Sequence, residues 1–294
     1  MPHEDEINDF PALFIPTYPP PAGFGEDTGL ARPVPAGVPY YLCWAITPLN
    51  PYQPGAPLRL TVTVGNWQGG NSSSLARVAL WWSPALSGAA IPRPERFIGF
   101  ASVPVPPHGS QVSTREISAV VPADAPPHIC VLAKVWHALD PAPTTMIDGK
   151  PTDVADPVND RHWAQRNLVT VKASGTQKIQ FIATNPKGEE ASVVLMVRPM
   201  DQALWPTLAR QLDAEPVATR ARVQLVDARG GGRTDGINVL RQQIDLAAGE
   251  ERGMTLEVAL FEPLRERSFA AYEVLQFKDD RPTGGFAVVL LGDG

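Results

Sequence analysis

The sequence predicts an all-β protein with two sandwich domains in tandem, and two observations favour this fold class. Short runs in which apolar and polar residues alternate recur along the chain, a pattern typical of strands with one buried face. The 32 prolines and 24 glycines exceed average usage and divide the runs into many short elements. The 294-residue chain is long enough for two hydrophobic cores of ordinary size.

Residues 1–38 are predicted to form a proline-rich, extended arm. Proline fixes φ and removes a backbone donor, so this segment suits neither a helix nor a central strand. The aromatic residues Phe10, Phe14 and Tyr18 are interaction candidates, because a solvated linker has little use for them. We expect the arm to lie along its own domain, and the alternatives are docking on a neighbouring subunit and a disordered tail.

Residues 39–173 are predicted to form the first sandwich. The run 58–64 alternates Leu and Val with Arg and Thr, and no helical pattern interrupts the strands that follow. The stretch 156–171 predicts a turn and then a strand that closes this domain. Two facing antiparallel sheets, an immunoglobulin-like sandwich, accommodate these strands most simply. The further strands are expected at 40–46, 77–82, 97–103, 111–121, 129–136 and 168–171.

Residues 174–294 are predicted to form a second immunoglobulin-like sandwich with one inserted helix near 201–212. Asp201 is the expected N-cap of this helix, and Leu204, Leu208 and Leu212 share one of its faces. The last strand is apolar on both faces and should be central or covered. The strands are expected at 178–184, 191–198, 219–226, 237–246, 254–261, 270–277 and 285–291.

Several motifs between about residue 53 and residue 171 follow one another in a familiar order. They are PYQPGAPLRLTVTVGNWQGG, ALWWSP, FIGFASVPVPPHG, HICVLAKV and NDRHWAQRNLVTV. In order and spacing they resemble a bacterial immunoglobulin-like domain related to the CARDB adhesion-type modules. The second half resembles plainer immunoglobulin-like modules. The resemblance implies a binding or scaffolding role and carries over no catalytic residue.

The sequence contains no serine-hydrolase, zinc-protease, Walker or dinucleotide-binding motif. The run GGGRTDG at 230–236 does not open a helix after a parallel strand, so we interpret it as a hairpin loop and not as a phosphate cradle. We therefore expect a protein that is not an enzyme, with no cofactor and no metal.

The loop 140–160 is rich in aspartate and long for a compact domain. Its spacing does not match an EF-hand loop, and Asp beside Pro or Gly is typical of turns, so a calcium site is an alternative only. His162, next to this loop, is the best candidate for a polar site, and an enzyme built on it is the least favoured hypothesis.

Charge and hydropathy restrict the partners. A net charge of −6 without a basic block argues against binding to nucleic acid. The sequence has no run of about 18 apolar residues, so it predicts no membrane-spanning helix. The acidic amino terminus does not predict a signal peptide, so we expect synthesis in the cytoplasm and leave non-classical export open. Cys43 and Cys130 are expected to be separate thiols, with a disulfide as the alternative.

The leading hypothesis is a non-enzymatic structural or protein-interaction subunit that self-associates through the arm, outward tryptophans and sheet edges. Strand alternation sends Trp81 and Trp82 to opposite faces of one sheet, so one of them should lie outside the core. The alternative is a carbohydrate- or surface-binding adhesin-type module. The remaining interaction candidates are Trp67, His162, Trp163 and Arg166.

Overall fold

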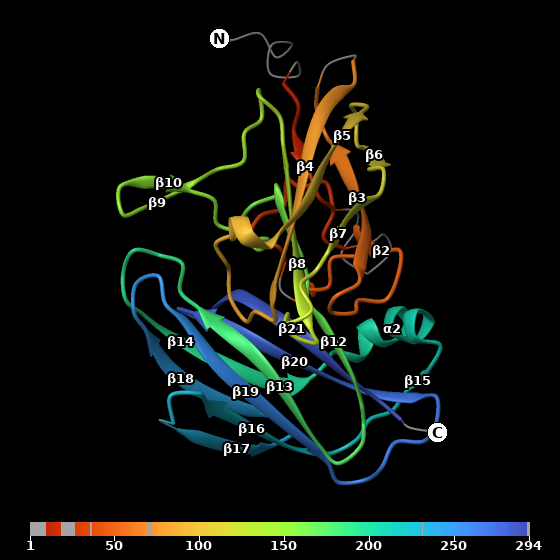
Figure 1. The fold of residues 1–294 in the computed structure, drawn as a ribbon, viewed down its shortest axis with the longest axis vertical. Helices are drawn as coiled ribbons and strands as arrows, with labels where there is room; N and C mark the ends of the chain where they lie inside the picture. The colour runs from red at the N-terminus through yellow and green to blue at the C-terminus, as the bar shows by residue number, and fades with distance from the viewer. Residues whose placement is uncertain (1–9, 19–26, 36, 70–71, 231, 293–294) are drawn as a thin grey trace. The chain divides into compact units, whose positions relative to one another are not determined.

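Two β-rich units make up the chain in a computed structural model (Figure 1). The structure describes residues 10–18, 27–35, 37–69, 72–230 and 232–292. The first unit comprises the chain up to Pro84 together with Ala90–Arg166, and the second comprises Ala85–Ala89 and the chain from Asn167 onward. The protein is therefore all-β, with two tandem immunoglobulin-like sandwiches, and its described residues include one short α-helix.

The described part of the first unit contains two main sheets and one two-stranded hairpin. In one, β3 lies between β1 and β2 on one side and β6 and β7 on the other; in the second, the order is β11-β8-β4-β5. The first sheet is formed by β1 (Leu13–Phe14), β2 (Ile46–Pro48), β3 (Pro57–Asn66), β6 (Ser110–Ser113) and β7 (Ile117–Val120). The second is formed by β4 (Ser74–Pro84), β5 (Phe97–Val105), β8 (Ile129–Trp136) and β11 (Trp163–Arg166), with a 3-10 turn, η1 (Pro94–Arg96), before β5.

The alternation of apolar and polar residues along β3 determines which of its side chains enter the core of this unit. Leu58, Leu60, Val62 and Val64 of β3 are all buried, whereas the residues between them face outward to varying degrees. They share one hydrophobic cluster with the inward residues of β4, β5 and β8. The two sheets therefore pack face to face, as a sandwich requires.

The described part of the arm docks on the first unit. Leu13 and Phe14 pair with Asn66 and Gly65 of β3, which makes this piece of the arm a strand. Leu13, Phe14 and Tyr18 are buried. Phe24 and the acidic residues at the amino terminus lie outside the described residues.

The aspartate-rich loop carries its own hairpin, β9 (Thr145–Ile147) and β10 (Lys150–Thr152). Asp148 and Gly149 at its tip both have positive φ, 49° and 71°, as a two-residue primed turn requires. Asp156 accepts hydrogen bonds from Asn159, again within a turn. Within the described ranges, no group of three or more His, Cys, Asp or Glu residues could hold a metal ion.

The second unit also contains two sheets, ordered β12-β21-β20-β14-β18 and β13-β19-β16-β17. The first comprises β12 (Leu168–Lys172), β14 (Ala191–Pro199), β18 (Leu240–Leu246), β20 (Ser268–Lys278) and β21 (Arg281–Leu291), with β15 (Glu215–Pro216) beside β20. The second comprises β13 (Thr176–Thr184), β16 (Ala221–Asp227), β17 (Arg233–Ile237) and β19 (Glu251–Leu260). Inward residues of both sheets form one cluster that includes Phe181, Leu225, Leu256 and Phe286.

The strand pairing of this unit is immunoglobulin-like. β14, β20 and β21 pair as the C, F and G strands do, and β13, β19 and β16 pair as the B, E and D strands do. The last strand, β21, is central, as its apolar sequence predicted, because β12 covers its other side in a parallel pairing. The GGGRTDG run was predicted to be a hairpin loop, and this is correct only for its first part. Residues 230 and 232 lie in the turn between β16 and β17, whereas residues 233–236 belong to β17; residue 231 lies outside the described residues.

The strand at 168–172 corrects one sequence-based expectation. We expected it to close the first domain, which was placed at 39–173, but β12 pairs with β21 in the second unit. The first unit instead ends with β11, and the division between the units falls between Arg166 and Asn167. The β-branched sequence predicts a strand here but contains no information about its partner, since pairing is set by residues far along the chain.

Residues Ala85–Ala89 belong to the second unit although they follow β4 of the first. Leu86 forms a parallel β-bridge with Ile182. The Ser87 amide donates to the Ile182 carbonyl at 3.0 Å, and the Ile182 amide donates to the Ala85 carbonyl at 2.8 Å. This short segment therefore lies along the edge of β13 that β19 leaves unpaired. An edge covered in this way is protected from pairing with other chains.

The predicted helix is present as a 3-10 turn, η2 (Gln202–Leu204), followed by α2 (Trp205–Leu212). Asp201 caps the 3-10 turn, since its Oδ1 accepts the Ala203 amide at 2.9 Å. Leu208 is the buried member of the leucine stripe. Within the part of the chain that is described, no helix has the length and apolar character needed to cross a membrane.

Candidate functional site

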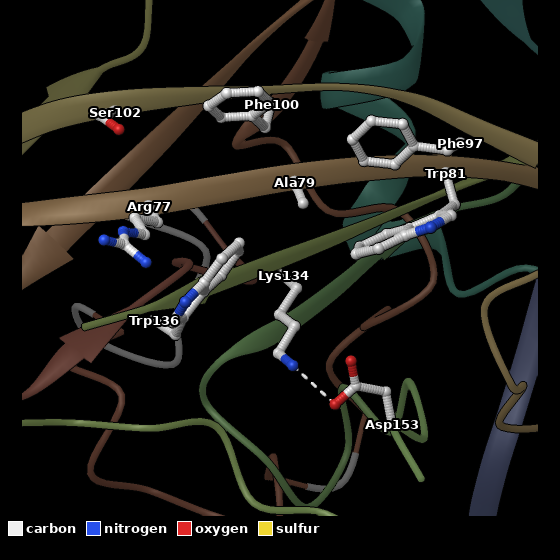
Figure 2. Close-up of a pocket in the computed structure, with 9 residues that line it drawn as sticks. All are labelled: Arg77, Ala79, Trp81, Phe97, Phe100, Ser102, Lys134, Trp136 and Asp153. Carbon is white, nitrogen blue, oxygen red and sulfur yellow. Dashed lines mark hydrogen bonds and ion pairs between the residues drawn. The ribbon is translucent and has the colours of Figure 1, made fainter. Parts of the chain in front are cut away.

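A groove with a volume of about 560 Å³ lies on the outer face of the β11-β8-β4-β5 sheet of the first unit (Figure 2). Its floor is Ala79, the smallest side chain in the lining, near the middle of β4. Larger side chains surround it, so the hollow exists because alanine occupies this position. The lining residues are Arg77, Ala79, Trp81, Phe97, Phe100, Ser102, Lys134, Trp136 and Asp153.

Strand periodicity and register bring these residues together. Arg77, Ala79 and Trp81 point to one face of β4, because alternate residues of a strand share a face. On β5 their cross-strand partners are Ser102, Phe100 and Phe97, respectively. On β8, Trp136 pairs with Arg77 and Lys134 pairs with Ala79. Asp153 follows the β9–β10 hairpin and completes the wall.

The groove has an aromatic rim. The rings of Trp81 and Phe97 meet edge to face with centroids 5.6 Å apart. Phe97 and Phe100 remain 45% and 63% exposed. Large exposed aromatic side chains that line a hollow are typical of binding surfaces.

Positive side chains outnumber negative ones in the groove, with Arg77 and Lys134 against Asp153. Lys134 lies between the Trp81 and Trp136 rings in Figure 2, and its Nζ is 2.6 Å from Asp153 Oδ1. The same Nζ lies 5.5 Å from the centroid of the Trp136 ring, within cation–π range. Arg77 makes no ion pair with any described residue, so the groove carries one uncompensated positive charge.

The tryptophan pair behaves as strand alternation predicts. Trp82 packs against the hydrophobic core, with the Arg96 guanidinium 5.3 Å from its ring centroid. Trp81 lies on the opposite face, in the groove. Trp67 is 39% exposed but belongs to a different place, where a Cβ on Gly109 would lie 3.4 Å from its ring. Trp67 therefore does not line the same groove as Trp81.

Three of the other interaction candidates are buried side chains. Phe14 and Tyr18 are buried within the first unit, and burial, followed by the Asp27 charge, raises the pKa of the Tyr18 phenol. Trp163 is fully buried. It pairs with Lys134 of β8 and so lies on the same face of the sheet as the groove, where its ring centroid is 5.9 Å from that of Trp81. Phe10, in contrast, is 51% exposed. Residues 11–18 are all buried, so Phe10 lies just before the stretch of the arm that docks on the first unit.

His162 forms a buried ionic cluster with two aspartates. Its Nδ1 is 2.8 Å from Asp160 Oδ1, and its Nε2 is 3.2 Å from Asp140 Oδ1. Burial would lower the pKa of the imidazole, but hydrogen bonds and charges from Asp140 and Asp160 outweigh it and raise the pKa. Arg161 Nη2 binds Asp140 at 2.5 Å and its Nε binds the Leu13 carbonyl at 3.0 Å. The cluster therefore fastens the arm to the first unit.

Arg166 and the two cysteines lie outside the lining of the groove. The Arg166 guanidinium donates to the Cys43 carbonyl at 3.3 Å, and burial lowers its pKa. Cys43 and Cys130 are free and buried. Burial is also the main reason that the pKa of the Cys43 thiol rises to about 11 and that of Cys130 rises well above its usual value.

Sequence reasoning missed most of the groove. Phe97, Phe100, Trp136 and Asp153 were not candidates, because their proximity to Trp81 depends on the pairing of β4 with β5 and β8. The available signal was the alternation within RVALWW and AKVW, which places Arg77 and Trp81 on one face of their strand and Lys134 and Trp136 on one face of theirs.

Comparisons with known proteins leave the family open. No protein-family model and no curated protein matches this sequence. Among solved structures, the chain is similar to the CupB6 tip adhesin from Pseudomonas aeruginosa, at 8% identity and a TM-score of 0.23, over 85% of this chain and 96% of that one. It is also similar to the collagen adhesin of S. aureus, at 7% identity and a TM-score of 0.25, over 83% of this chain and 91% of that one. The Bacteroides uniformis β-glucuronidase matches at 13% identity and a TM-score of 0.27, over 82% of this chain and 26% of that one. The class of the protein, a tandem immunoglobulin-like β-sandwich, follows from its own strand pairing.

Proposed function

We propose that this chain is a non-enzymatic binding module whose ligand site is the groove on the outer face of β4, β5 and β8. The observation that carries the proposal is the convergence of exposed aromatic side chains with Arg77, Lys134 and Asp153 around the small floor residue Ala79. Aromatic surface supplies affinity, and a few well-placed polar groups supply orientation. The resemblance of residues 53–171 to CARDB-type modules supports the same role.

Filling the groove tests this proposal. Ala79→Trp places a large ring on the floor, whereas Ser118→Trp adds the same ring to an exposed position on β7 of the other sheet. Immobilised peptides and oligosaccharides that retain the wild-type protein should retain the Ser118→Trp variant and lose the Ala79→Trp variant. Equal retention of both variants would contradict the proposed site.

A second surface favours self-association. Among the described strands, β17 is an edge strand that pairs with β16 alone, and Ile237 at its end is 56% exposed. An exposed edge with an apolar side chain is a template for strand addition. We propose that any assembly of this subunit uses this edge and not the buried aromatics of the arm. Light scattering should show an oligomer for wild type and a smaller species for Ile237→Lys; identical masses would refute this route.

A further inference from the structure

The groove on β4, β5 and β8 combines features that select one chemical class of ligand. We propose that it binds a sugar ring that carries a carboxylate, as in a uronate-containing polysaccharide. This inference rests on the proposed function of the groove and specifies its ligand.

The backbone around the groove favours a sugar over an extended peptide. β4 pairs with β5 on one side and with β8 on the other, so the strand beneath the groove has no free edge. An extended peptide is normally recognised by main-chain hydrogen bonds to such an edge. Here a peptide would lay its amides over Ala79 and the aromatic rings, where they would lose water without gaining partners.

The aromatic residues suit the apolar face of a sugar ring. Trp81 and Trp136 lie at two sides of the Ala79 floor, and Phe100 borders it on β5 (Figure 2). A pyranose presents C–H groups on its faces and hydroxyls at its rim, so it can stack on indole while its polar groups point outward. The volume of about 560 Å³ lies within the range of roughly 300–1,000 Å³ for small-ligand sites.

The polar side chains match the rim of such a ring. Asp153 accepts hydrogen bonds and Lys134 donates them, and Ser102 can do either, which suits vicinal hydroxyls. Lys134 and Asp153 already neutralise each other at 2.6 Å. They therefore supply orientation and leave the net charge to the remaining group.

That remaining group is Arg77. It is exposed, it lines the groove, and it has no carboxylate partner among the residues that the structure describes. A guanidinium binds a carboxylate through two parallel hydrogen bonds, which a neutral sugar cannot accept in the same way. The charge complementarity selects a uronate over a neutral hexose.

Calorimetric titration of the full chain tests the inference with chemically matched ligands. Oligogalacturonate, oligomannuronate and oligoguluronate are the probes, and methyl-esterified oligogalacturonate keeps the ring but removes the charge. We expect at least one free uronate to bind, and Arg77→Gln to weaken that binding about tenfold because one charge-assisted contact is lost. Arg115→Gln removes a positive charge from an exposed position outside the groove and should leave affinity unchanged.

The outcomes separate this inference from the proposed function. If methyl-esterified oligogalacturonate binds as tightly as the free acid, or if Arg77→Gln has no effect, the carboxylate preference is wrong. If no oligouronate binds but an acidic peptide does, and Ala79→Trp abolishes binding of that peptide, the proposed ligand class is wrong and the proposed binding site is supported. If Ala79→Trp leaves every observed binding unchanged, both the inference and the proposed site are wrong. Arg77 is exposed, so Arg77→Gln is expected to fold and to remain informative if the Ala79→Trp variant does not.

Discussion

Asp140 binds the backbone of Leu13 across 127 positions of the sequence, with its Oδ2 accepting the Leu13 amide at 2.7 Å. The same carboxylate receives Arg161 and faces His162. A single buried side chain therefore joins the arm, the loop before β11 and the imidazole of His162. This relationship explains how a proline-rich segment becomes an ordered part of the first unit.

Replacement of Asp140 by alanine should loosen the arm. The Leu13 amide and the Arg161 guanidinium would lose their acceptor, and the free energy of unfolding should fall by about 2–3 kcal/mol, as expected for a buried hydrogen bond to a charged group. Urea denaturation measures the loss, and limited proteolysis should show earlier cleavage near residues 10–18. Asp124→Ala, at an exposed turn, is the control and should change neither.

The stability of the first unit should depend on the protonation of His162. Its pKa is raised in the folded protein, so its contribution is fully present below the unfolded pKa near 6.5 and is lost as the pH rises through the folded pKa. The free energy of unfolding, measured from pH 6 to pH 9, should therefore fall with rising pH, and His162→Gln should flatten this slope.

His128 provides the opposite behaviour within the same unit. Burial lowers the pKa of His128, so its effect is a loss of stability as the pH falls through the unfolded value near 6.5. His128→Gln should therefore change the profile on the acid side only. An unchanged alkaline slope in His162→Gln would contradict the role assigned to the cluster.

Gly65 of β3 leaves space for the Phe14 ring. A Cβ on Gly65 would overlap the ring of Phe14, so Gly65→Ala should cost roughly 1–3 kcal/mol of stability through overpacking. Phe14→Ala alone should cost about 3–5 kcal/mol. In the double variant the two losses should be less than additive, because the clash requires both groups. Gly188→Ala, which has open space around its Cβ position, should be neutral; strict additivity in the double variant would rule out the proposed contact.

Gln276 should be important for the stability of the second unit. Its Oε1 lies 3.0 Å from the Ser87 hydroxyl, and its Nε2 donates to the Thr184 carbonyl at 2.8 Å. Gln276→Ala would leave buried polar groups unpaired, so thermal denaturation should reveal a loss of about 1–3 kcal/mol. Gln243→Ala removes one exposed hydrogen bond to Ser192 and should have little effect. Equal losses in the two variants would argue against a role for the buried network.

The sequence predicted strands better than it predicted their partners. The alternation of Leu58, Leu60, Val62 and Val64 is local information, and the structure buries all four. Val169 likewise lies in a strand, but its pairing with Val288 depends on residues more than a hundred positions away. Proline content predicted an extended arm, but the burial of Phe14 depends on Gly65, which has no side chain and so leaves no hydrophobic pattern.

The candidate site shows the same limit. Opposite orientations of Trp81 and Trp82 follow from the pleat of a single strand. The groove around Trp81 also needs Phe97, Trp136 and Asp153, which come from three other segments. Its floor at Ala79 was inconspicuous in the sequence, because a small residue in an apolar strand indicates a hollow only when its neighbours across the sheet are known.

The placement of Ala85–Ala89 in the second unit limits how this protein can have evolved. A recombination event at Arg166/Asn167 would transfer the strands after that point but leave behind the five residues that cover the edge of β13. The transplanted half would lose the Leu86 carbonyl that Asn167 Nδ2 contacts at 2.7 Å, and it would expose an unpaired strand. The two sandwiches are therefore expected to have been inherited as a pair and not shuffled as separate modules.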